Sequence, residues 1–306
     1  MSGLARPVRI LERLALPAPF GIVFWDFATG ARVGDGLEVT LTQVSRPALT
    51  TTLIANRAGV WIAPKLPGRA DWELAATADW STLARTYRIA VADRFGRFLP
   101  LTIEAELPAR GLYQWPHWSG LPGAPLAPLI EGRSPPELDP ARIPLFSAPE
   151  RKVAGPLAEL RCELVDVATG APAPWALVTA SCDDERHVSV TRGIGLADKE
   201  GRATLFFPYP RGPRRQLPIS PPAITDFRWD IDIAAYYVPP SGPAPDAPDL
   251  AAIMAQLAHP CRLIGSLSSP PHPLGAQSLS FGRPLVLRTD NPPEGPSSSL
   301  FLDRGP

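Results

Sequence analysis

Apolar and polar residues alternate along many short stretches of the chain, which is the pattern of β-strands with one buried face. The clearest stretches are residues 21–25, 37–42, 87–91, 99–105, 160–164 and 227–233. Glycine-containing turns, such as those at Gly59 and Gly96, separate them. This spacing of about seven short strands per domain predicts an all-β protein built from aligned two-sheet sandwiches of the immunoglobulin-like kind.

One segment has a helical period instead. Leu250, Ile253, Met254 and Leu257 stand at i, i+3, i+4 and i+7, and His259-Pro260 ends the pattern. Elsewhere the proline content argues against helix: 40 of 306 residues, about 13% against a usual value of about 5%. The sequence therefore predicts one short helix over residues 249–257.

Parts of the sequence recur. Asp26-Phe27-Ala28-Thr29-Gly30 returns as residues 166–170, at an offset of 140, and the Asn56–Gly59 turn returns as 198–201, at an offset of 142. Residues 87–91 match 229–233, again at 142, and Phe95-Gly96-Arg97 matches 281–283 at 186. The difference, 186 − 142 = 44, predicts about 44 additional residues in the second copy after Ile233. A duplicated strand-and-turn unit explains this order of matches.

These observations predict three parts. Residues 1–108 form the first β-sandwich domain, 109–155 a proline-rich connector, and 156–306 the second β-sandwich domain, with an insertion at 236–280 that contains the helix. The connector carries the aromatic cluster Tyr113, Trp115 and Trp118, which we expect to pack along a surface because exposed tryptophan is costly.

Charge and composition exclude several classes of protein. Lysine plus arginine and aspartate plus glutamate are 30 each, so no net charge draws the chain to nucleic acid or to an anionic membrane. No apolar run is long enough for a membrane span or a signal peptide. We therefore expect synthesis in the cytoplasm without a signal peptide. Three cysteines without close pairs predict neither a disulfide framework nor a zinc site.

The candidate chemistry is sparse, and we expect no enzyme, no cofactor and no metal. The four histidines lack metal-ligand spacing, and His259 beside Cys261 lacks an acidic residue placed to orient it. Asp183-Asp184-Glu185 is consistent with a Ca²⁺ loop or, more simply, with a solvated hairpin tip. No phosphate-binding glycine loop and no nucleophile or metalloprotease motif occurs in the sequence.

The eight tryptophans leave a carbohydrate-binding module as an alternative, because exposed aromatic rings stack on sugars. Trp25, Trp61, Trp175 and Trp229 lie at strand or turn positions and are more simply core residues. The remaining four fit either sugar stacking or packing and protein contacts: Trp72, Trp80, Trp115 and Trp118.

The two repeated turns resemble those of the carboxypeptidase-regulatory-like, or transthyretin-like, β-sandwich family, although Ala replaces the family's Thr before Asn56 and Asp198. The copies cover residues 20–107 and 156–238 with 276–303. A tandem sandwich with the segments 97–100, 145–149 and 205–210 is similar to proteins encoded with contractile injection systems and phage-tail-like particles. This resemblance implies a structural or accessory role, possible export only as part of a released particle, and no catalytic residues.

The resulting hypothesis is a non-enzymatic structural or adaptor component of such a particle, whose partners are other protein subunits. A carbohydrate- or surface-binding module and a transthyretin-like hydrolase are the alternatives. The expected partner contacts lie in the connector, in a basic loop and on the helix: Tyr113, Trp115, Trp118, Arg211, Arg214, Arg215, Leu250, Ile253 and Met254.

Overall fold

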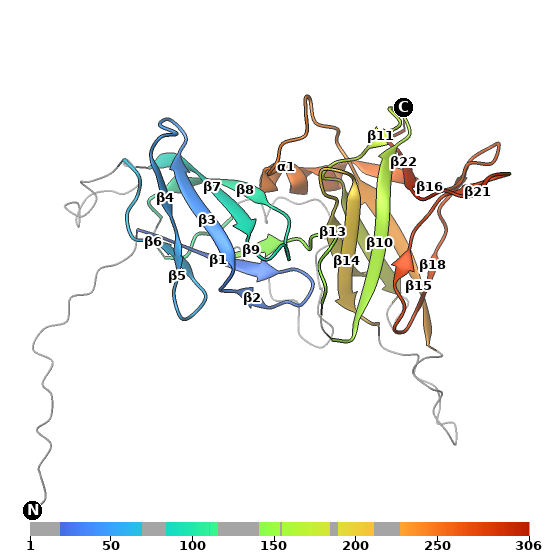
Figure 1. Cartoon of the computed structure of the whole chain (residues 1–306), viewed down its shortest axis with the longest axis horizontal. Helices are drawn as coiled ribbons and strands as arrows, with labels where there is room; N and C mark the ends of the chain where they lie inside the picture. Colours follow the sequence, from blue (N-terminus) through green and yellow to red (C-terminus); the bar gives the residue numbers. More distant parts are fainter. Residues whose placement is uncertain are drawn as a thin grey trace, which may run out of the picture.

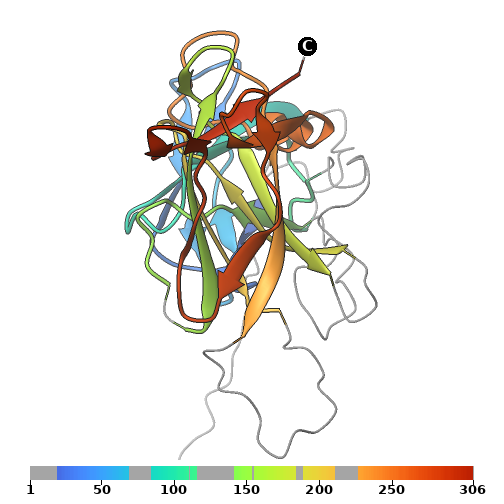
Figure 2. The same ribbon diagram turned by 90° about the vertical axis from the view of Figure 1, so that its right-hand side faces the viewer.

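The computed structural model describes residues 19–68, 84–109, 111–115, 141–153, 155–183, 189–210 and 227–305. Within these ranges the chain forms two β-sandwiches side by side, with one short helix between them (Figure 1). The view turned by 90° shows the strands of the second sandwich crossing in two layers (Figure 2). The predicted fold class is confirmed.

The first sandwich packs two sheets face to face. One has the strand order β2 (Arg32–Val33), β1 (Phe20–Asp26), β6 (Trp61–Ala63) and β5 (Ile54–Ala55), with β9 (Arg142–Leu145) parallel to β1. The other has the order β4 (Thr50–Thr52), β3 (Leu37–Gln43), β7 (Arg85–Asp93) and β8 (Leu101–Leu107). The alternation of apolar and polar residues in the sequence matches the two faces of this second sheet. The apolar residues Val39, Ile89 and Ile103 are buried against the other sheet. The charged residues Arg88 and Glu104 are exposed on the outer face.

The second sandwich is centred on β10 (Leu157–Asp166). This strand pairs with β11 (Ala171–Pro172) and β14 (Arg202–Pro208) in antiparallel fashion, and with β19 (Leu285–Val286) and β22 (Leu300–Asp303) in parallel. The opposite layer holds β12 (Leu177–Asp183), β13 (Ser189–Leu196), β15 (Arg228–Tyr236) and β18 (Gln277–Ser280). β16 (Pro260–Ser266) pairs with both β15 and β22 and so joins the two layers. Three short strands complete it: β17 (His272–Pro273), β20 (Asp290–Asn291) and β21 (Gly295–Pro296).

The first repeated turn has the same hydrogen bonds in both copies. The carboxylate of Asp26 accepts from the backbone N–H of Ala28 (3.0 Å) and from the Thr29 hydroxyl (2.5 Å), and Asp166 accepts from Ala168 (3.1 Å) and Thr169 (3.2 Å). Each turn closes on a glycine with positive φ, 68° at Gly30 and 65° at Gly170, a conformation that side chains disfavour. The short-range sequence match therefore reports a real structural equivalence.

The second repeated turn is also conserved in geometry. Oδ1 of Asn56 accepts from the backbone N–H groups of Ala58 and Val60, at 2.9 and 3.0 Å. Oδ1 of Asp198 accepts from Glu200 and Arg202 at 2.9 and 2.8 Å. Asn and Asp both supply this acceptor, which is why either residue serves at the position.

The fourth sequence match is wrong. Phe95-Gly96-Arg97 precedes β8, whereas Phe281 follows β18, the strand that pairs with β15 as β8 pairs with β7. Strand pairing instead aligns Leu107 with Phe281, at an offset of 281 − 107 = 174. The second copy therefore gains 174 − 142 = 32 residues here, not 44. The error arose because Phe-Gly-Arg is a short turn sequence without long-range information.

The predicted connector completes the first sandwich. The N–H of Tyr113 donates to the carbonyl of Gly21 (2.7 Å), as the N–H of Leu287 donates to Arg161 (2.9 Å). β9 lies parallel to β1 as β22 lies parallel to β10. The first repeat thus continues past residue 107, where the sequence comparison ended it. Its closing strand shares only short apolar matches with its counterpart, such as Leu145 with Leu302, which are too few to be recognised in the sequence.

Each copy also ends in an ion pair to the aspartate of its first turn. Arg151 binds Asp26 through two nitrogens, Nη1 to Oδ1 at 2.9 Å and Nη2 to Oδ2 at 2.6 Å, and Nη1 also donates to Ser147. Arg304 binds Asp166 with Nη2 to Oδ2 at 3.1 Å. We call these the first and second ion pairs. In the first, both side chains are buried (8% and 6% exposed), whereas Arg304 in the second is 32% exposed.

Removing the charge of Asp26 is expected to destabilise the first sandwich. Asp26→Asn keeps an acceptor for Ala28 but leaves Arg151 buried without a counter-charge, so we expect a loss of about 3 kcal/mol in the free energy of unfolding. Asp166→Asn is the matched control, with an expected loss of about 1 kcal/mol because Arg304 can turn to solvent. Urea unfolding followed by tryptophan fluorescence measures both. Equal losses would contradict the role of burial.

The first ion pair also predicts a pH dependence. Burial raises the pKa of Asp26, but hydrogen bonds from Arg151 and Thr29 and the charge of Arg151 outweigh this effect and hold the pKa below its usual 3.8. The stabilisation is therefore fully present above the unfolded-state pKa and is lost as the pH falls through the folded-state pKa. We expect the stability difference between wild type and Asp26→Asn to be constant from about pH 5 to about pH 7 and to shrink below about pH 4. A difference that does not change with pH would refute this assignment.

Candidate functional site

The predicted helix forms and lies between the two sandwiches. α1 (Leu250–Ala255) continues into a 3-10 turn over Gln256–Ala258, and β16 begins at Pro260. Asp249 caps its N-terminus by accepting from the backbone N–H of Ala252 (3.0 Å). The helix belongs to the chain segment between β15 and β16 of the second sandwich and contacts β8 of the first.

The apolar face of α1 is part of a core that both sandwiches share. Leu250, Ile253 and Met254 are at most 1% exposed. They pack in one cluster with first-sandwich residues, such as Phe20 and Leu101, and with second-sandwich residues: Trp175, Leu177, Ile194 and Leu196. We call these helix residues and their neighbours from both sandwiches the junction cluster.

Backbone hydrogen bonds tie the same segment to the edge of the first sandwich. The N–H of Thr102 in β8 donates to the carbonyl of Pro248 (2.8 Å), and Thr102 and Asp249 form an isolated parallel bridge. On the other side, the Gln256 side chain donates to the carbonyl of Trp175 (2.8 Å) and accepts from the N–H of Val238 (3.0 Å). Polar groups at both ends of the helical segment are therefore satisfied within the chain.

Tyr113 and Trp115 also belong to the junction cluster. Tyr113 is buried, its hydroxyl donates to the carbonyl of Glu104 (3.1 Å), and its ring lies 5.9 Å from that of Phe20. Burial, followed by the negative charge of Asp249, raises the pKa of Tyr113 to about 12. Trp115 is 2% exposed.

These positions correct the sequence-based expectation of a partner surface. Five of the nine predicted contact residues make their contacts inside the chain, because their apolar side chains close the space between the sandwiches: Tyr113, Trp115, Leu250, Ile253 and Met254. The other four, Trp118, Arg211, Arg214 and Arg215, lie outside the described residues. The apolar pattern located the helix correctly, but a pattern cannot distinguish a core within one chain from an interface between two chains.

A second contact region lies where the chain passes from one sandwich to the other. The Thr204 hydroxyl of β14 donates to the carbonyl of Pro149 (3.1 Å), and Arg202 pairs with Glu150 (3.1 Å). Arg202 also pairs with Asp198 (2.7 Å), the acceptor residue of the second turn. No pattern in the sequence predicted this contact, because its residues are distant in sequence and meet only after the chain has folded.

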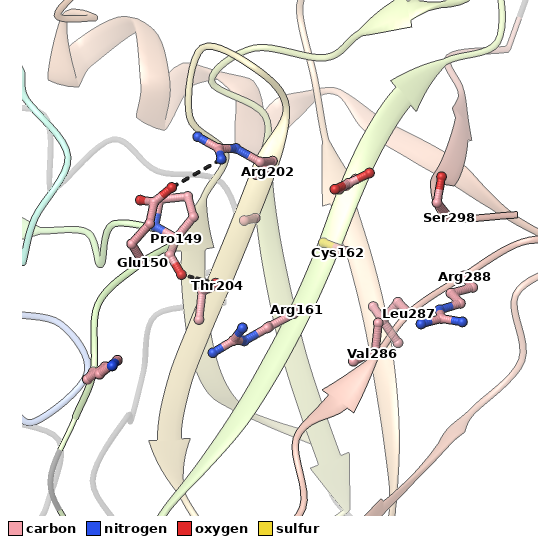
Figure 3. A pocket seen from close by; sticks show the side chains of 13 residues that line it. Pro149, Glu150, Arg161, Cys162, Arg202, Thr204, Val286, Leu287, Arg288 and Ser298 are labelled. Atoms are coloured by element: carbon pink, nitrogen blue, oxygen red, sulfur yellow. Dashed lines mark hydrogen bonds and ion pairs between the residues drawn. The ribbon is translucent and has the colours of Figure 1, made fainter.

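A shallow hollow of about 580 Å³ lies beside this contact, on the outer face of β10, β14 and β19. Arg161 stands in the middle of the sheet face, between Thr204 and Val286 (Figure 3). The walls carry both signs of charge: Lys152, Arg161, Arg202 and Arg288 against Glu150 and Glu163. Such a mixed surface suits polar contacts with another protein.

The described residues offer little reactive chemistry in this hollow. Cys162 in its floor is buried, and burial, with a smaller contribution from Glu163, raises the pKa of its thiol to about 12, so it stays protonated at neutral pH. Burial likewise raises the pKa of the Cys261 thiol. The described ranges contain no group of three or more His, Cys, Asp and Glu residues placed to hold a metal ion. Asp184 and Glu185 of the considered Ca²⁺ loop lie outside these ranges.

The described tryptophans do not form a row for sugar stacking. Trp61, Trp115 and Trp175 are buried, and the guanidinium of Arg142 lies 4.0 Å from the ring centre of Trp25. Trp229 is half-buried and stacks obliquely with Tyr209 at 5.3 Å. Trp72, Trp80 and Trp118 lie outside the described residues.

Comparisons with known proteins give structural likenesses only. No family model and no curated protein matches the chain. One solved structure that resembles it is a streptococcal ancillary pilin, with 10% identity and a TM-score of 0.21 over 94% of this chain and 62% of that chain. Another is GBS52, the minor pilin of Streptococcus agalactiae, with 8% identity and a TM-score of 0.22 over 94% of this chain and 97% of that chain. A 9R-lipoxygenase from Cyanothece PCC8801 matches with 13% identity and a TM-score of 0.22, over 47% of this chain and 18% of the lipoxygenase chain. The chain thus spans less than two thirds of the lipoxygenase and of the ancillary pilin.

One further structural observation concerns membranes. In the part of the chain that the structure describes, α1 is the α-helix present, and no helix reaches the length and apolar character of a membrane span.

The junction cluster predicts the effect of shortening a helix side chain. Ile253→Ala leaves a cavity between the sandwiches, so we expect the free energy of unfolding to fall by about 3 kcal/mol and the radius of gyration to rise. Ala255→Ser, at an exposed position of the same helix, is the control and should change neither quantity. Urea unfolding and small-angle X-ray scattering check this, and identical behaviour of the two variants would contradict it.

Proposed function

We propose that the protein is a non-enzymatic structural component that acts as one rigid two-sandwich block through contacts with other protein subunits. The observation that carries this proposal is the junction cluster. Side chains from both sandwiches and from α1 are buried in a single core, at most 7% exposed. Domains within a chain usually meet through smaller, more polar surfaces and move relative to each other. A shared core fixes their relative orientation.

Features outside the junction support the same role. The two ion pairs join the chain that follows the last strand of each copy to its first turn, so that each sandwich is closed by long-range contacts. The exposed surface beside the junction carries paired charges, among them those of Arg202 and Glu150. A block of fixed shape with polar outer faces suits repeated protein contacts, since little conformational entropy is lost on assembly.

The finer proposal places this block in a phage-tail-like or contractile injection particle. Its support is the similarity of the segments 97–100, 145–149 and 205–210 to proteins encoded with such particles, together with the tandem arrangement. In this setting the chain would join other subunits of the particle and would leave the cell only with it.

The test is assembly in the cells that encode the protein. A C-terminally tagged full chain should sediment on a density gradient with other protein subunits, as part of an assembly much larger than its own 32.9 kDa. The double variant Ile253→Ala, Met254→Ala should sediment less with the assembly, and Ala255→Ser should behave as wild type. Sedimentation of the wild-type chain as a free monomer would overturn the proposal. So would turnover of an ester or peptide substrate, or specific binding on a glycan array.

A further inference from the structure

The outer face of the first sandwich carries an exposed apolar patch. It consists of the exposed Ile54 and Leu112 and the half-buried Val60 and Ile62, gathered around Gly21. A Cβ added to Gly21 would lie 3.4 Å from Val60, 3.6 Å from Leu112 and 3.9 Å from Ile62, so these three side chains converge over the glycine. Ile54 stands opposite Ile62 on the neighbouring strand and is 61% exposed, and Leu112 is 40% exposed.

The second sandwich shows that the fold does not require apolar residues on this face. Pairing aligns Gly21 with Arg161, Ile62 with Thr204 and Leu112 with Val286. Of these equivalents Arg161 is polar and exposed, Thr204 is polar and buried beneath Pro149, and Val286 is apolar and exposed, so the second sandwich has no apolar cluster at these positions. Clustered exposed apolar side chains in a soluble protein usually mark a surface that something covers.

An acidic hollow adjoins the patch. It has a volume of about 520 Å³ and is lined by Glu104, Glu106 and Leu112, among other residues. Glu104 is paired with Arg88 at 3.0 Å, and Glu106 accepts a hydrogen bond from Thr86. Leu112 belongs to both features, so the apolar patch and the acidic hollow are continuous. A ligand that covers both needs apolar side chains and positive charges.

The segment that precedes β1 has this composition. Residues 1–18 lie outside the described residues, and the described chain begins at Pro19, two positions before Gly21. The segment combines apolar residues with three arginines and a single acidic residue: Val8, Ile10, Leu11, Leu14 and Leu16, with Arg6, Arg9 and Arg13, and Glu12. It enters beside the centre of the patch, and at about 3.3 Å per extended residue it is long enough to cross it.

We propose that residues 8–16 bind back onto the outer face of the first sandwich. Their apolar side chains cover Ile54, Ile62 and Leu112, and their arginines face the hollow that contains Glu104 and Glu106. Because the segment ends only five positions before Gly21, its effective concentration at the patch is high, and a weak interaction is sufficient for occupancy.

Limited trypsin digestion of the full chain tests this proposal, because trypsin cleaves after Arg9 and Arg13. We expect cleavage at these bonds to be at least about ten-fold slower in the wild-type chain than in a free peptide of residues 1–18. Leu112→Gln, which removes the apolar side chain without adding charge, should bring the rate close to that of the peptide. Ile54→Gln is a second, independent variant with the same expected effect. Val286→Gln, at the equivalent exposed position of the second sandwich, should retain full protection.

Three results would overturn the proposal. Cleavage of the wild-type segment as fast as that of the peptide would show that the patch does not hold it. Equal protection in wild type and in both patch variants would show that the segment binds elsewhere. Protection that increases with protein concentration would show that the segment of a second copy covers the patch. Circular dichroism of each variant establishes that the sandwiches remain folded.

Discussion

Burial of one helix face between two sheets is the interaction on which the rest of this structure depends. Leu250, Ile253 and Met254 each remove an apolar side chain from water, a gain of about 1.5–3 kcal/mol per side chain. That gain is realised only when both sandwiches are in place, because β8 lies on one side of the helix and Trp175 on the other. The arrangement of the two sandwiches is therefore coupled to the folding of the inserted segment.

Within each sandwich, local and long-range interactions meet at one residue. Asp26 first organises its own turn through Ala28 and Thr29, which requires only neighbouring residues. The same carboxylate then binds Arg151, 125 positions further along the chain. Because the turn itself orients the acceptor oxygens, the pair with Arg151 has to fix fewer further degrees of freedom, which lowers its cost in entropy.

This division explains what the sequence could and could not predict. The turns at Asp26 and Asn56 and the helix at 249–257 are local, and their sequence patterns predicted them correctly. β9 and the Asp26–Arg151 pair depend on residues distant in sequence, so a proline-rich stretch was interpreted as a connector. The burial of Tyr113 and Trp115 was missed for the same reason: composition shows that an aromatic residue needs cover but does not show which surface provides it.

The two copies differ on their outer faces and agree in the backbone geometry of their turns and closing strands. Turn acceptors persist, since Asn56 and Asp198 make the same bonds. The parallel closing strand persists with buried apolar residues at matching positions, Leu145 in the first copy and Leu302 in the second. The outer faces differ: the first sandwich has a half-buried Ile62 where the second has Thr204, which is buried beneath Pro149. A duplicated scaffold with distinct outer faces can meet two different surroundings through one rigid body. A difference of this kind does not arise from the folding requirements of either copy, and so it reflects what each face contacts.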